Sequence, residues 1–206
     1  SRSHCTNCGH ELGPLDLVPV FSYLFLKGQC RYCKTKISPL YLVGELITGI
    51  TFALIYWLFG FNLDFAIHAV TGSMLVILVI TDLIEKTVPN RIVLVALIAV
   101  LILRIFKGEN LVFYLISSVA VFGLLFMVMV LSGGKLGGGD VKLYAVIGLT
   151  IGIWHSLISI FLASLGALIV IIPQILLKRI DWKHPIPFVP FIWIGVLLSY
   201  FVHVSL

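Results

Sequence analysis

Two acidic residues stand at the margins of apolar segments, and the first follows a run of glycines. Asp140 comes directly after Gly137, Gly138 and Gly139, between two long apolar stretches. Each glycine costs a helix about 1 kcal/mol relative to alanine, so the run favours a sharp turn or a close approach of another chain. An ionisable group at the margin of a membrane segment is a candidate functional residue. We therefore predict that Asp140 does chemistry within a loop that extends to Lys142.

Asp82 is the second candidate, because it ends an apolar segment on the side of the membrane predicted for Asp140. Two carboxyl groups held close together in a medium of low dielectric share one proton. Such a pair can activate water with one member and protonate the leaving amine with the other, as in aspartic proteases. Glu85 lies three residues beyond Asp82, but the Lys86 that follows it indicates a solvated position.

Other interpretations of these acids remain open. Either acid can be solvated at a helix end, and Asp140 can cap the following helix by accepting hydrogen bonds from its first amides. Paired membrane acids also line proton or cation pathways. A pathway explains the acids but neither the glycines nor the cysteines described next. The pattern therefore favours a peptidase and leaves an ion-conducting membrane protein as the alternative.

The four cysteines form two C-x-x-C pairs, separated by twenty-one residues, near the start of the chain. Each pair can form a tight turn whose two thiolates point at one centre, and two such turns make a tetrahedral four-sulfur site suited to zinc. Two disulfides are the alternative, and a reducing cytoplasm argues against them. We predict a zinc module that contains Cys5, Cys8, Cys30 and Cys33.

A third acid, Glu45, lies about one turn inside the first long apolar segment. It can pair with Lys34 or Lys36 at the membrane surface, or it can face a polar cavity inside the protein. The residues around it leave both interpretations open.

The composition excludes a soluble globular domain, because 60% of the residues are hydrophobic, 11% are charged and the mean hydropathy is +1.14. A helix needs about 20 residues to cross a bilayer. We predict an all-α polytopic membrane protein, with a cytoplasmic module at residues 1–40 and a transmembrane peptidase domain at residues 41–206. Its seven expected spans are residues 41–59, 65–81, 92–103, 111–131, 141–154, 156–177 and 188–206.

The basic residues predict the orientation. Seven spans place twelve of the fourteen lysines and arginines on one side, and only Arg104 and Lys107 on the other. The basic side is therefore cytoplasmic, and it carries the cysteine module and both aspartates. The net charge of +5 reflects this topology and attraction to anionic lipid, and does not indicate nucleic-acid binding. The chain opens without Met, which predicts further residues upstream.

These residues together resemble the bacterial type IV prepilin peptidases, a family of intramembrane aspartyl proteases with a G-x-G-D signature. The resemblance rests on Gly137 to Asp140, on the spaced cysteine pairs, and on Asp82 followed by Val88, Pro89 and Asn90. It also includes residues 186–191, Ile-Pro-Phe-Val-Pro-Phe, at the start of the last apolar segment.

The resemblance implies an inner-membrane enzyme with two activities, which serves type IV pili or type II secretion. It would cut the basic leader from prepilins or pseudopilins after a glycine on the cytoplasmic side, with Asp82 and Asp140 as its catalytic pair. It would then methylate the new N-terminal residue with S-adenosylmethionine, and the four-cysteine module is associated with that step. Glu45 matches a recurrent acid of the family that could serve the methyltransferase or a polar cavity. Family members have eight spans, the first upstream of Ser1. A peptidase without methylation is a further alternative.

Overall fold

The computed structural model describes residues 3–134, 136–177 and 186–202. Within these residues the chain is helical, and its only β pairing is two isolated bridges, His4 with Glu11 and Gln29 with Lys36. The prediction of an all-α protein is therefore confirmed. The chain divides into two compact units, Ser1–Ile50 and Thr51–Leu206.

The first unit is built around two turns with the same hydrogen bonds. In one turn the Cys5 amide donates to the His10 carbonyl, and in the other the Cys30 amide donates to the Thr35 carbonyl, both at 2.9 Å. Each turn ends in the left-handed region, at Gly9 and at Lys34. The other elements are the 3₁₀-helix η1 (Pro14–Asp16), the short helix α1 (Phe21–Phe25) and the start of α2 (Pro39–Phe59).

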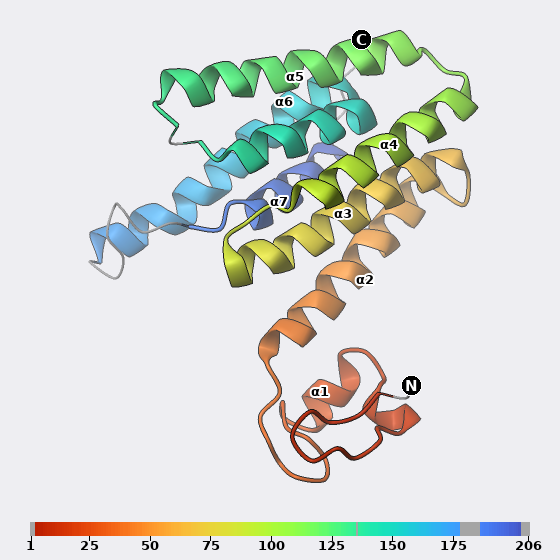
Figure 1. Ribbon diagram of the computed structural model, residues 1–206, viewed down its shortest axis with the longest axis vertical. Helices are drawn as coiled ribbons and strands as arrows, with labels where there is room; N and C mark the ends of the chain where they lie inside the picture. The colour runs from red at the N-terminus through yellow and green to blue at the C-terminus, as the bar shows by residue number, and fades with distance from the viewer. Residues whose placement is uncertain (1–2, 135, 178–185, 203–206) are drawn as a thin grey trace. The chain divides into compact units, whose positions relative to one another are not determined.

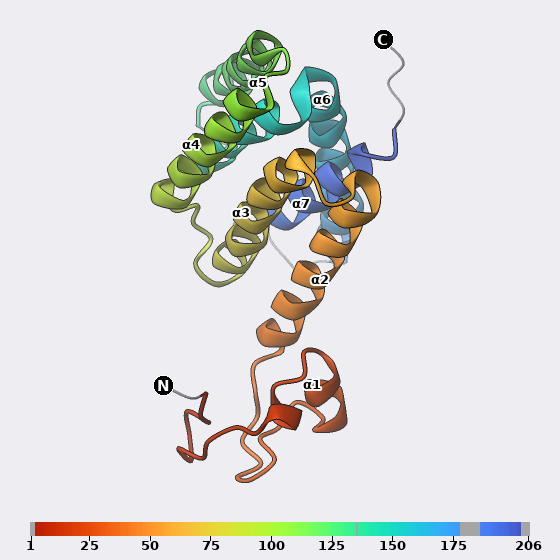
Figure 2. The same ribbon diagram turned by 90° about the vertical axis from the view of Figure 1, so that its right-hand side faces the viewer.

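The second unit is a helical bundle that continues from α2. Its central helix is α6, which packs against four other helices, whereas α7 packs against α3 and α6 (Figures 1 and 2). The bundle helices are α3 (Leu63–Glu85), α4 (Asn90–Lys107), α5 (Leu111–Leu131), α6 (Gly138–Leu176) and α7 (Val189–Ser199).

Four of these helices, α2, α3, α5 and α6, are long and apolar enough to cross a membrane. The helix α4 is eighteen residues long and carries Arg91, Arg104 and Lys107, and α7 is shorter. Large apolar side chains are exposed along α5, as expected of a surface that faces lipid rather than water. These exposed residues include Val112, Ile116, Val119, Met127 and Leu131. The chain is a multi-pass membrane protein.

The helix α6 folds back on itself at Gly152. This glycine has φ 75° and ψ 177°, which lies outside the helical region and is accessible to glycine. Beyond it, the Ser159 hydroxyl lies 3.4 Å from the Tyr144 hydroxyl, although a straight helix would separate residues fifteen apart by roughly 22 Å. The separate segments expected at 141–154 and 156–177 are thus the two arms of α6 (Figure 1).

Small residues bring the first arm of α6 close to α5. A Cβ atom added at Gly148 would lie 2.9 Å from the Cα of Ser118, so only glycine allows this approach. The Ser118 hydroxyl in turn donates to the Ala145 carbonyl at 2.7 Å. Small residues at such contacts are typical of membrane helices. The first arm, which carries Asp140 in its first turn, is therefore held firmly against its neighbour.

Candidate active site and metal centre

Asp82 lies in the last turn of α3 and is only 7% exposed. Its Oδ2 atom accepts a hydrogen bond from the backbone amide of Val189 at 2.9 Å. Because Val189 is the first residue of α7, this amide has no partner within its own helix, and the positive end of the helix dipole favours a carboxylate there. The start of α7 thus fixes the Asp82 side chain in place.

Asp140 lies in the first turn of α6, whose N-cap is Gly137. Its backbone amide donates to the Gly137 carbonyl at 3.1 Å, as expected at the start of a helix. Among the described residues its carboxyl group makes no hydrogen bond, so the simple capping role is not seen. Asp140 stands at the start of α6, beside the loop that follows Asp82 at the end of α3, so the structure places the two predicted acids at neighbouring helix ends. Asp82 is held by an amide, whereas the Asp140 carboxyl has no hydrogen bond among the described residues.

The last glycine of the run allows the loop after α3 to pack against the start of α6. A Cβ atom added at Gly139 would lie 2.7 Å from the Cβ of Val88, a distance that real side chains do not tolerate. The exposed Lys142 side chain donates to the Asn90 Oδ1 atom at 3.1 Å, which joins the same two segments. Lys142 thus positions the loop. Glu85 is exposed, as the sequence predicts, and accepts a hydrogen bond from the Thr87 hydroxyl at 3.4 Å.

The Val189 amide is the part of this site that side-chain patterns could not indicate. A backbone donor leaves no signature in residue types, and the only available signal was the Pro-rich segment at residues 186–191. Lys135, the basic residue that precedes the glycine run, lies outside the described residues.

The four cysteines form a cluster with the dimensions of a metal centre. Their sulfur atoms all lie within 4.8 Å of one another, and all four thiols are free. The Sγ atoms of Cys5 and Cys33 are 3.8 Å apart, and tetrahedral zinc with Zn–S bonds of about 2.3 Å requires roughly this spacing. The two turns thus bring their thiols to one point, and Cys8 and Cys30 complete the set. The donor set fits a four-sulfur metal ion, whereas the alternative of two disulfides is not formed.

Residues 69–172 match the type IV leader peptidase family, and residues 1–59 match the bacterial peptidase A24 N-terminal domain. The chain is 33% identical over 200 residues to the prepilin leader peptidase/N-methyltransferase of Bacillus subtilis, covering 97% of this chain and 81% of that protein. The chain belongs to the type IV leader peptidase family.

Two further relatives with the same name also match most of the chain. A protein of Pseudomonas aeruginosa with the same name is 33% identical over 214 residues, covering 95% of this chain and 71% of that protein. Another from Aeromonas salmonicida is 30% identical over 207 residues, again covering 95% and 71%. No solved structure matched the chain. The predicted resemblance is therefore confirmed across both the cysteine-containing and the helical parts of this leader peptidase.

The cysteines of this leader peptidase differ in acidity. Hydrogen bonding by the side chain and backbone of Thr35 lowers the pKa of the Cys33 thiol to about 5. A backbone hydrogen bond at His10 acts to lower the pKa of Cys8, but desolvation and the neighbouring Cys33 together raise it to about 11. Because hydrogen bonding favours a thiolate at Cys33 and desolvation favours a thiol at Cys8, a metal ion that binds all four sulfurs at neutral pH must displace at least one proton.

We expect zinc affinity to rise between pH 6 and pH 8 by about tenfold per pH unit for each proton displaced. Competition between the protein and a chromogenic chelator at several pH values measures this slope. Cys8→Ser serves as the comparison, because serine is a poor zinc ligand. An affinity that does not change with pH would contradict the assignment of Cys8 as a protonated ligand.

Glu45 has a partner that neither sequence interpretation anticipated. Its Oε2 atom accepts a hydrogen bond from the Val20 amide at 2.6 Å. Val20 has φ 65° and ψ −52°, and the Phe21 amide donates to the Pro19 carbonyl at 2.6 Å, so these residues form a γ-turn. This turn is strained, particularly at a β-branched residue. Glu45 therefore stabilises an unfavourable backbone conformation in the first unit.

Replacing Glu45 with alanine should release the Val20 amide, because no acceptor would hold it in the γ-turn. We expect hydrogen exchange of that amide to become about tenfold faster, which corresponds to the loss of one hydrogen bond. Exchange measured residue by residue in detergent provides the readout. Glu45→Gln keeps an acceptor oxygen and is the matched control. Equal exchange in all three proteins would show that Glu45 does not hold the turn.

Proposed function

We propose that this chain cleaves the leader peptide from type IV prepilins or pseudopilins and methylates the new N-terminal residue. The names of its relatives, prepilin leader peptidase/N-methyltransferase, support both activities. One observation carries the assignment of the peptidase site. Asp82 at the end of α3 and Asp140 at the start of α6 lie at helix ends that pack together through Val88 and Gly139, and the first amide of α7 holds Asp82.

The proposed reaction is hydrolysis without a covalent intermediate. The acid pair shares one proton, and its ionised member takes a proton from a water molecule that attacks the scissile carbonyl. The protonated member donates its proton to the carbonyl oxygen, which gives a tetrahedral diol. The member that took the water proton then passes it to the leaving amine while the other removes a proton from a diol hydroxyl, so the C–N bond breaks and the pair again holds one proton. Asp82 is held by the Val189 amide, and Asp140 is free to follow the reacting atoms.

The substrate must present its scissile bond in an extended form. A peptide bond inside a helix is already hydrogen-bonded, so local unwinding precedes cleavage. The turn at Gly137 exposes backbone next to Asp140, which supports this loop as the place where the substrate chain enters. The excess of basic residues on one predicted side supports a cytoplasmic position for this loop and for the cysteine cluster. Cleavage of the leader, which we propose to occur after a glycine, would then take place on the cytoplasmic side.

The cysteine cluster supports zinc as a structural ion of the first unit. Zinc would be held by Cys5, Cys8, Cys30 and Cys33, and it would supply a crosslink between the two turns. S-adenosylmethionine would supply the methyl group, which transfers to the free amine that cleavage produces. A peptidase without methylation remains the second candidate function.

Incubating a leader-bearing prepilin with the protein and S-adenosylmethionine carrying a labelled methyl group tests both activities. We expect the label to appear only on the mature N-terminus, because the amine is not free before cleavage. Cleavage without incorporation of the label would support a peptidase that does not methylate its product. An Asp82→Asn variant that alters proton flux across vesicles, in a protein that never cuts prepilin, would instead support the ion-conducting alternative.

A further inference from the structure

An apolar surface lies on the outside of the first unit, between its two cysteine turns. The short helix α1 exposes Phe21, Leu24 and Phe25, whose spacing of three and four residues puts them on one helical face. The Phe25 side chain is 83% exposed. Exposed apolar residues gathered in this way mark interaction sites, because contact with water is unfavourable for them. We call this the α1 surface, and the chain before α1 extends it with Leu15, Leu17 and Val18.

Glu45 ties the α1 surface to the start of a membrane helix. It accepts a hydrogen bond at 2.6 Å from the amide of Val20, the residue immediately before α1. Glu45 belongs to α2, which begins at Pro39 and is long and apolar enough to cross a membrane. Because a helix rises 1.5 Å per residue, Glu45 lies roughly 9 Å along α2 from its start. Tyr41, which is 68% exposed on the same helix, is an aromatic residue typical of membrane interfaces. The α1 surface therefore lies close to the end of α2 that enters the bilayer.

Two lysines lie beside this surface, around a cavity of about 450 Å³. Lys27 follows α1, Lys36 precedes α2, and both line the cavity together with Tyr23 of α1. The Tyr23 hydroxyl donates to the Ile37 carbonyl at 3.3 Å, and the Ile37 amide donates to the Gly28 carbonyl at 2.8 Å. These hydrogen bonds join α1 to the chain that enters α2, so the cavity and the α1 surface belong to one ordered structure.

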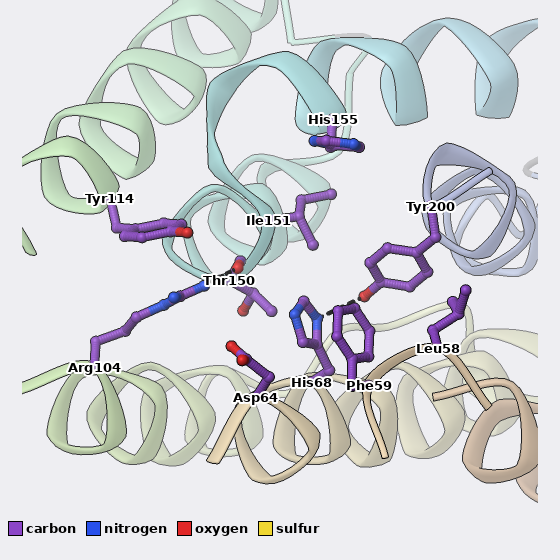
Figure 3. A pocket seen from close by; sticks show the side chains of 10 residues that line it. All are labelled: Leu58, Phe59, Asp64, His68, Arg104, Tyr114, Thr150, Ile151, His155 and Tyr200. Carbon is purple, nitrogen blue, oxygen red and sulfur yellow. Dashed lines mark hydrogen bonds between the residues drawn. The ribbon is translucent and has the colours of Figure 1, made fainter. Parts of the chain in front are cut away.

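The charges of these two lysines are not used within the protein. Both side chains are exposed, and neither forms an ion pair in the part of the chain that the structure describes. Two basic residues of the second unit differ in this respect. Arg104 donates to two backbone carbonyls of α6, one of them that of Thr150 (Figure 3). Lys107 forms ion pairs with Asp64 and Glu109. The lysines beside the α1 surface are therefore available to an anion outside the chain.

We propose that the α1 surface docks on the anionic headgroup layer of the bilayer, on the side where α2 begins. Its apolar side chains would enter the boundary between headgroups and acyl chains, and Lys27 and Lys36 would bind lipid phosphates beside it. Apolar side chains combined with basic residues are typical of segments that lie in the membrane interface. An apolar protein partner would account for the α1 surface but would leave the two lysines without a role. Docking would hold the cysteine cluster beside the membrane.

Photocrosslinking of the full chain in lipid bilayers tests this proposal. A benzophenone side chain is placed at Phe25 in the α1 surface and, as a control, at Thr6, an exposed residue of the first cysteine turn. The bilayers consist of phosphatidylcholine alone or of equal parts of phosphatidylcholine and phosphatidylglycerol. We expect lipid adducts from position 25, at a yield that phosphatidylglycerol increases, and few from position 6. Crosslinks from position 25 mainly to protein, whether to this chain or to an added prepilin, would overturn the proposal, as would equal lipid yields from the two positions.

Replacing the lysines tests their part in docking. Lys27→Gln combined with Lys36→Gln removes two charges, and each basic residue near an anionic surface favours the docked state about fivefold. We expect the ratio of lipid-crosslinked to free protein at position 25 to fall by this factor for each lysine, at a salt concentration where half of the unaltered chain is crosslinked. Lys86→Gln combined with Arg91→Gln removes two exposed charges from the second unit and should leave the ratio unchanged. An unchanged ratio in the first pair, or an equal fall in both pairs, would overturn the assignment of the lysines.

Discussion

Replacing either Asp82 or Asp140 with asparagine is expected to lower the rate of prepilin cleavage by about 10²- to 10⁴-fold. Asparagine has nearly the same shape as aspartate but can neither take a proton from water nor return it to the leaving amine. In Asp82→Asn, the side-chain oxygen can still accept the Val189 hydrogen bond, so the fold should survive. The measurement is the initial rate of leader removal at a saturating concentration of prepilin.

The two aspartates should also behave as one unit. Once the first is replaced the shared proton is lost, so the double variant should be little worse than either single variant. Glu85→Gln is the matched control, because Glu85 lies on the same helix as Asp82 but is exposed to solvent. If Glu85→Gln lowered the cleavage rate as much as Asp82→Asn does, the assignment of Asp82 rather than Glu85 as the catalytic acid would be wrong.

Gly139→Ala should abolish most of the activity, whereas the adjacent Gly138→Ala should be tolerated. The added methyl group at Gly139 would lie 2.7 Å from the Cβ atom of Val88, so the loop after α3 or the start of α6 must move. Asp140 follows directly, and a displacement of about 1 Å at a reacting group can cost 10²-fold in rate. At Gly138 the nearest atom is the Met129 sulfur at 3.7 Å, an ordinary contact.

The comparison between the two glycines separates crowding from helix propensity. Both substitutions put alanine into the first turn of α6, so any gain in helix stability is shared. Cleavage rate and Tm are measured for both variants. Adding Val88→Gly to Gly139→Ala removes the clashing atoms and should recover part of the activity. Equal rates in the two alanine variants would mean that the contact with Val88 does not position Asp140.

Asp82 and Asp140 could be singled out as candidates, and the cysteine cluster could be predicted, because charges and thiols are rare in so apolar a chain. Only nine residues are acidic, so Asp140 after three glycines was conspicuous. The spacing of the cysteines likewise predicted one four-sulfur centre, and the sulfur atoms do converge. In both cases the chemistry is carried by side chains whose identity is printed in the sequence.

The remaining parts of the site depend on backbone geometry, which residue types do not reveal. The Val189 amide that holds Asp82 and the Val20 amide that holds Glu45 come from segments distant in sequence. Arg104 was expected at the end of a helix on the noncytoplasmic side, and its burial follows from the break at Gly152, which exposes carbonyls for it to bind. The sequence divided this region into two apolar segments, 141–154 and 156–177, but could not show that they form one helix broken at Gly152.

The most direct test of the central claim is mass spectrometry of a prepilin incubated with the purified chain in lipid bilayers. The protein is compared with its Asp82→Asn and Asp140→Asn variants, and the products define the bond that is cut. We predict that the unaltered chain alone releases the leader after a glycine, and that neither variant yields the mature product on the same timescale. Release at a comparable rate by either variant would contradict the assignment of Asp82 and Asp140 as the catalytic pair.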